Sequence, residues 1–135
     1  MTAARRYAAV QNHTASKERL TVLLFETALK HMRGGAQHLE AKRRSEAMPL
    51  LAKAAEIVAH LHATLKREVA PKLVDELKEL YTFTTARITR AMATANPADV
   101  REAERAFAPI ADGFARAVAA QQATQAQQAP MAATK

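Results

Sequence analysis

Residues 71–95 place the strongest constraint on what this chain can fold into. Their apolar face repeats at steps of three and four residues: Leu73, Leu77, Leu80, Tyr81, Thr84, Ile88, Ala91 and Ala95. This spacing predicts an amphipathic α-helix that Pro71 begins and that ends before Pro97, because proline disfavours helical geometry in the residue preceding it. A helix of about 25 residues cannot bury such a stripe alone. The rest of the chain must therefore supply partner helices.

Three further segments show helical periodicity, residues 17–41, 45–67 and 97–120. Ser16 and Asn96 are candidate N-caps for the first and the last of them. Short linkers between long helices favour antiparallel neighbours. We therefore predict an all-α fold in which residues 16–120 form an antiparallel four-helix bundle. Residues 1–15 are expected to form a short N-terminal arm, and residues 121–135, rich in Ala and Gln without periodicity, a disordered C-terminal tail.

The first predicted bundle helix, residues 17–41, is apolar over more than half of its circumference. Such a helix is either central in the fold or covered by something other than water. Gly34 and Gly35 weaken it by roughly 1 kcal/mol each relative to alanine. A glycine pair inside a helix indicates either close approach of another backbone or a hinge, and the sequence leaves both open. Pro109 interrupts the fourth helix and is expected to bend it.

The composition excludes several classes of protein. The chain has 135 residues and no cysteine, which excludes disulfides and thiol chemistry. No run of apolar residues is long enough to cross a membrane, and the N-terminus lacks the apolar core of a signal peptide, so we expect a cytoplasmic protein without stable membrane insertion. The net charge of +7 lies mostly in residues 1–70, but no aromatics interleave the basic residues and no nucleic-acid-binding motif is present. A solvated basic surface is the simpler interpretation.

The sequence shows no pattern typical of an enzyme. His60 and His62 are two residues apart and would point in opposite directions on a helix. His31 and His38 share a face, but no carboxylate completes a metal site there. There is no glycine-rich phosphate loop and no nucleophile-and-base motif. We therefore expect no catalytic residues, no metal and no cofactor.

Several short segments, in order and at similar spacing, resemble the flagellar secretion chaperone family FliS. They are a Tyr in the N-terminal arm (Tyr7), Thr14-Ala15-Ser16 before Leu20, Leu24-Phe25-Glu26-Thr27-Ala28-Leu29, Lys53-Ala54-Ala55-Glu56-Ile57-Val58-Ala59-His60-Leu61, and Leu77-Lys78-Glu79-Leu80-Tyr81-Thr82-Phe83 followed by the Asn96 turn. The resemblance runs from about Tyr7 to Phe114. It implies a four-helix bundle that binds the disordered C-terminal segment of flagellin, prevents its premature polymerisation and, as a complex with cargo, meets a component of the type III export gate.

The resemblance also suggests which residues contact the cargo. They are Ile57, Leu61 and Leu65 in the second helix and Leu77, Leu80 and Tyr81 in the third, with Tyr7 on the arm covering part of the groove until cargo displaces it. Each helix residue could equally belong to the core of the bundle, because the same positions form the inward stripes. Surplus apolar surface on the first helix and small residues such as Ala54, Ala55 and Ala59 would supply grooves between helices.

Two other functions fit the composition. A coat protein of the phasin type also has Ala- and Gln-rich helices with wide apolar faces, and a basic helical bundle could bind nucleic acid. Granule association in cells would favour the first of these, and retardation of DNA or RNA the second. The sequence does not decide which flagellin is bound, the oligomeric state, or whether a co-chaperone takes part.

Overall fold

The computed structural model describes the backbone of residues 3–68 and 70–133 and the side chains of residues 16–68 and 70–127. It contains four helices: α1 (Ala3–Glu40), α2 (Arg44–Ala63), α3 (Pro71–Thr94) and α4 (Pro97–Ala133). The described residues contain no strand. The predicted all-α fold is confirmed.

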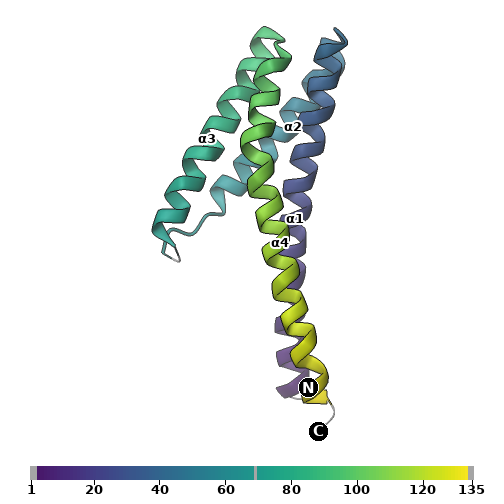
Figure 1. Ribbon diagram of the computed structural model, residues 1–135, viewed down its shortest axis with the longest axis vertical. Helices are drawn as coiled ribbons and strands as arrows, with labels where there is room; N and C mark the ends of the chain where they lie inside the picture. Colours follow the sequence, from purple (N-terminus) through teal and green to yellow (C-terminus); the bar gives the residue numbers. More distant parts are fainter. Residues whose placement is uncertain (1–2, 69, 134–135) are drawn as a thin grey trace.

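The helices run alternately up and down, so that chain neighbours are antiparallel (Figure 1). α1 packs against α2 and α4, and α3 packs against the same two helices, which closes a four-membered ring of contacts. α1 has 38 residues and α4 has 37, whereas α2 has 20 and α3 has 24. The two long helices therefore continue together beyond the short pair (Figure 1). We call this extension, residues 3–24 of α1 and 114–133 of α4, the stem.

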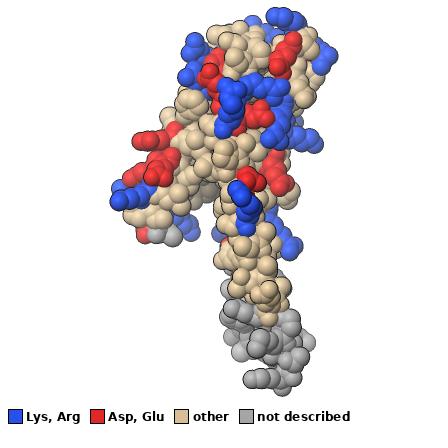
Figure 2. All heavy atoms as spheres, viewed as in Figure 1, with Lys and Arg blue, Asp and Glu red and all other residues tan. Residues whose placement is uncertain are grey.

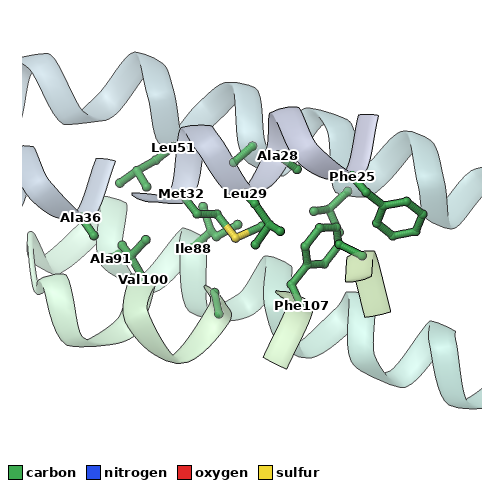
Figure 3. Packing of buried hydrophobic residues seen from close by; sticks show 14 of the residues in the cluster. Phe25, Ala28, Leu29, Met32, Ala36, Leu51, Ile88, Ala91, Val100 and Phe107 are labelled. Carbon is green, nitrogen blue, oxygen red and sulfur yellow. The ribbon is translucent and has the colours of Figure 1, made fainter. Parts of the chain in front are cut away.

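The core fills the space where all four helices overlap (Figure 3). Its largest fully buried side chains come from every helix: Phe107, Met32, Leu51, Ile88, Val58, Val100 and Thr84. At the stem end of the core, Phe25 packs on Phe107 with ring centroids 5.4 Å apart and on Phe114 at 5.3 Å. The aromatic cluster thus joins the bundle to the stem.

The glycine pair in α1 marks a close approach of two helices. A Cβ atom added at Gly35 would lie 2.5 Å from Leu51 Cδ2 and 2.9 Å from Leu51 Cγ, both in α2. One at Gly34 would lie 3.1 Å from Leu50 Cδ1. α1 remains helical through both residues. Of the two interpretations that the sequence left open, the structure supports close packing.

The ends of α3 and α4 follow the proline signals, as predicted. Pro71 and Pro97 are the first residues of their helices, and the Asn96 side-chain oxygen accepts a hydrogen bond from the Ala98 N–H at 3.0 Å. The outer ends of α1 and α4 differ from the prediction. α1 begins at Ala3 rather than after Ser16, and α4 continues as helix to Ala133 through most of the segment predicted to be a tail.

The physical reason for these longer helices is helix propensity. Ala and Arg are the commonest residues in the first extension and Ala and Gln in the second, and these residues favour helix even where no tertiary contact forms. Among the described side chains, the outermost buried ones on the two long helices are Phe25 in α1 and Val118 in α4. The division into arm, bundle and tail stays a prediction.

Ion pairs fasten the first half of α4 to its neighbours. Arg33 of α1 donates to Glu104 at 2.6 Å, and Arg101 of α4 donates to Glu40 of α1 at 2.6 Å. On the other side, Arg87 of α3 lies 3.2 Å from Glu102. All of the α4 residues in these cross-helix pairs lie before Pro109.

Candidate functional site

The six residues that were expected to contact cargo from the second and third helices do not form a single surface. Leu65 lies outside α2, because this helix ends at Ala63 and not near residue 67 as predicted. Leu61 and Tyr81 are buried in the core, whereas the other four, Ile57, Leu65, Leu77 and Leu80, are partly buried. The side chain of Tyr7 lies outside the described residues. Only Leu61 and Leu65 of this set line the cleft described below.

Tyr81 is a core residue by its surroundings. Its ring lies 6.2 Å from that of Phe107 and 6.1 Å from that of His62, measured between centroids. Burial raises the pKa of Tyr81 to about 12, because the phenolate would lose its hydration. The ring therefore helps to join α2, α3 and α4.

An apolar cleft opens where α2 ends beside the stem. Leu61 and Leu65 form one wall, Leu20 and Leu24 of α1 form the other, and Phe114 of α4 contributes to its lining. The cleft encloses about 670 Å³. Figure 2 shows a hollow between the free end of the short helix pair and the stem.

The cleft exists because the four helices differ in length. α2 ends at Ala63, and the chain then turns away toward Pro71, while α1 and α4 continue (Figure 1). The apolar side of α1 is left without cover at this level, so Leu20 is 57% exposed. Leu23, which faces the neighbouring groove beside α4, is 56% exposed. Large aliphatic side chains on a bundle are normally packed, and contiguous exposed ones mark interaction sites.

Six of the twelve residues that line the cleft are polar, His60 among them, and the two threonine hydroxyls already form hydrogen bonds. The Thr21 hydroxyl donates to the Lys17 carbonyl at 3.0 Å, and the Thr64 hydroxyl donates to the Leu61 carbonyl at 2.9 Å. Their methyl groups are therefore the parts left for a ligand. Lys17, Glu18 and Lys66 add a charged rim of mixed sign. An apolar floor with a polar rim is the usual arrangement of a protein-binding surface.

Sequence reasoning missed Leu20, Leu24 and Phe114. The surplus of apolar residues in the first helix was visible in the sequence, but the residues left uncovered depend on where the neighbouring helix stops. No signal for this was available in the sequence, because the predicted helices 17–41 and 45–67 are nearly equal in length, whereas α1 spans Ala3–Glu40 and α2 ends early, at Ala63.

Two shallower grooves lie elsewhere. One follows the stem between its two helices and is lined by Val22, Leu23, Ala115, Val118 and Ala119, with Arg19 and Gln122 at its edges. The other lies between α2 and α3 and is lined by small side chains with His62: Ala59, Ala63, Thr82, Thr85 and Ala86. Ala59 was expected in such a groove, whereas Ala54 is fully buried.

The surroundings of His31 and His38 are those of structural residues, with charged side chains nearby. His31 lies near Lys53 and Lys30, and burial together with these two cations lowers its pKa. His38 Nδ1 lies 3.2 Å from Glu46. Within the described part of the chain, no three His, Asp or Glu side chains gather as metal ligands do. No helix there is both long enough and apolar enough to cross a membrane.

A comparison with protein families gives one result. The model of the family described as flagellar protein FliS matches residues 1–122, a range that includes α2, α3 and every residue named above for the cleft. No curated protein matches the chain. Because the family model covers most of the sequence, the chain belongs to the flagellar protein FliS family, a family of flagellar export chaperones.

Proposed function

We propose that this chaperone binds the disordered C-terminal segment of flagellin in the cleft beside the stem. Binding there keeps the segment from polymerising in the cytoplasm, and the complex is then delivered to the export gate of the flagellar type III apparatus. No catalytic step and no cofactor is needed for this function. The observation that carries the proposal is the exposed leucine surface of α1 opposite Leu61 and Leu65.

A leucine side chain that stays exposed to water leaves hydrophobic stabilisation unused. Complete burial of a leucine side chain contributes about 1.5–3 kcal/mol. Leu20 still exposes 57% of its surface, so covering it contributes about 1 kcal/mol. A cargo segment whose own apolar side chains enter the cleft gains as much again from each of them. An amphipathic segment that folds as a helix in this groove is therefore a suitable ligand.

Release matters as much as binding for an export chaperone. A disordered segment that orders on binding loses about 2–5 kcal/mol of the interaction energy. A large contact surface can therefore coexist with an affinity modest enough for transfer. The mixed charges of Lys17, Glu18 and Lys66 at the rim add little net attraction to this balance.

The N-terminal arm has a proposed role in this site. We expect the arm with Tyr7 to cover part of the groove until cargo displaces it, which requires residues 3–15 to leave the helical course that carries α1 away from the cleft (Figure 1). Deleting residues 1–13 should then strengthen cargo binding or increase the binding of an apolar dye. No change in either would contradict a covering role.

A matched pair of leucines tests the site. Leu73 in the first turn of α3 is 54% exposed, close to the value for Leu20, but it does not line the cleft. Calorimetric titration with the C-terminal segment of flagellin from the same genome should show binding to the natural chain. Leu20→Ser should weaken it at least fivefold, and Leu73→Ser should leave it unchanged. Absence of binding, or equal weakening by both substitutions, would contradict the proposal.

A further inference from the structure

The second half of α4 is held differently from the first. Residues 99–104 carry the ion pairs to α1 and α3, including Arg33 to Glu104 and Arg101 to Glu40. Among pairs in which both side chains are described, which on α1 begin at Ser16, residues 114–127 form no hydrogen bond or ion pair with another helix. Their described contacts are apolar, through Phe114 on Phe25 and Val118 against the stem partner.

Two helix-weakening residues separate these halves. Pro109 has no N–H to donate to the Arg105 carbonyl, so one helical hydrogen bond is missing there. Gly113 follows one turn later, and both residues are exposed. A Cβ at Gly113 would meet no atom within 4 Å, so packing does not require glycine at this position. Gly35 differs, because a neighbouring helix occupies the space beside it.

The weakened turn lies beside the cleft. Phe114, the residue directly after Gly113, lines the cleft and packs on Phe25. Leu24 borders the same space from α1. Swinging the end of α4 outward would join the cleft to the groove along the stem and uncover Phe25, which is 4% exposed in the closed arrangement.

We propose that residues 109–113 are a hinge about which the distal part of α4 swings away from α1, and that the opened stem is the form that admits the apolar segment of the cargo. The second half of this proposal rests on the proposed function. The closed helix then acts as an internal cover for apolar surface while no cargo is bound. Binding requires the open form, so the apparent affinity falls with the fraction of molecules that are open.

Hydrogen exchange of the full chain without cargo tests the hinge. Amides in residues 114–127 should exchange faster than those in 98–108. Gly113→Ala favours the helical state of the hinge and should slow exchange in 114–127 about fivefold where exchange follows the population of the open form. Pro109→Ala should act in the same direction. Thr89→Ala, on the exposed face of α3, is the control and should leave exchange in 114–127 unchanged.

Titration with cargo tests the link between the open stem and cargo binding. Gly113→Ala should weaken binding of the flagellin C-terminal segment about fivefold, because fewer molecules are open, although it makes the fold more stable. Equal exchange in both halves of α4, unaffected by Gly113→Ala, would overturn the hinge. Slower exchange with unchanged binding would overturn the link to cargo. If the natural chain binds no flagellin segment, the proposed function and this link fail, and the exchange data still decide the hinge.

Discussion

Replacing the three glycines one at a time by alanine gives a graded test of the packing. The chemical change is the same at each position, and all three residues lie inside helices. Removing glycine from a helix interior gains about 1 kcal/mol. The surroundings then decide whether the free energy of unfolding rises or falls. The added methyl group meets no atom within 4 Å at Gly113, one Leu50 methyl at 3.1 Å at Gly34, and Leu51 at 2.5 Å at Gly35.

The expected magnitudes follow from these distances. Gly113→Ala should raise the free energy of unfolding by about 1 kcal/mol. At Gly35 the gain is opposed by overpacking, which costs about 1–3 kcal/mol, because Leu51 is fully buried and cannot move aside freely. Gly35→Ala should therefore lower the free energy of unfolding by about 1 kcal/mol. Gly34→Ala should fall between the two, since the neighbouring Leu50 is only partly buried and can shift.

Urea denaturation followed by circular dichroism measures these differences. The two extreme variants should differ by about 2 kcal/mol, which corresponds to roughly 8 °C in the midpoint of thermal unfolding. The natural chain is the reference in each experiment. If Gly35→Ala stabilised the protein as much as Gly113→Ala, the close approach of α1 and α2 at Gly35 would be refuted.

Two further predictions concern ionisable groups. Burial raises the pKa of Glu104, but hydrogen bonds from Arg33 and Arg101 and their charges outweigh it and hold the pKa below its ordinary value. The stability that Glu104 contributes should therefore be present above about pH 4.3 and be lost as the pH falls through the lower pKa of the folded state. In urea titrations, Glu104→Gln should lower the free energy of unfolding by about 1 kcal/mol at pH 7 and by little at pH 2. A difference between the two proteins that stays constant with pH would contradict this. The chain has two tyrosines, so Tyr7→Phe leaves Tyr81 as the only phenol. The ultraviolet absorbance of this variant should change with a midpoint near pH 12, the pKa of buried Tyr81, rather than near pH 10. A midpoint near pH 10 would show that the ring is not buried.

Much of the fold could be predicted because local signals agreed with one another. Pro71 and Pro97 begin helices where proline is tolerated, and the apolar spacing of residues 71–95 indicated the face that is buried from Tyr81 to Ala91. In the first turn of the helix the prediction was wrong, because Leu73 is 54% exposed and Val74 is buried in its place. Gly35 indicated a close helix contact, although a hinge was an equal alternative until the space around it was known. The outer ends were not predicted, since Ala-rich segments without an apolar stripe can be helical without packing.

The candidate site was only partly predictable. Leu61 and Leu65 were named from the sequence, but a periodic stripe does not say which of its members lies at the edge of a core. Tyr81 and Leu65 were both assigned to inward stripes, yet Tyr81 is buried against Phe107 and Leu65, which follows the end of α2, borders the cleft. That distinction arises from the different lengths of the helices and from where the turn after α2 leaves the bundle, which are properties of the assembled fold.

Site-specific photocrosslinking tests most directly whether the cleft beside the stem holds the flagellin C-terminal segment. A benzophenone amino acid is placed at Leu20 in the cleft or at Leu73 outside it, and the crosslinked peptides are identified by mass spectrometry after irradiation with full-length flagellin. We expect crosslinks from position 20 to the C-terminal segment of flagellin and none from position 73. Crosslinks that start equally from both positions, or that reach other parts of flagellin, would contradict binding in the cleft.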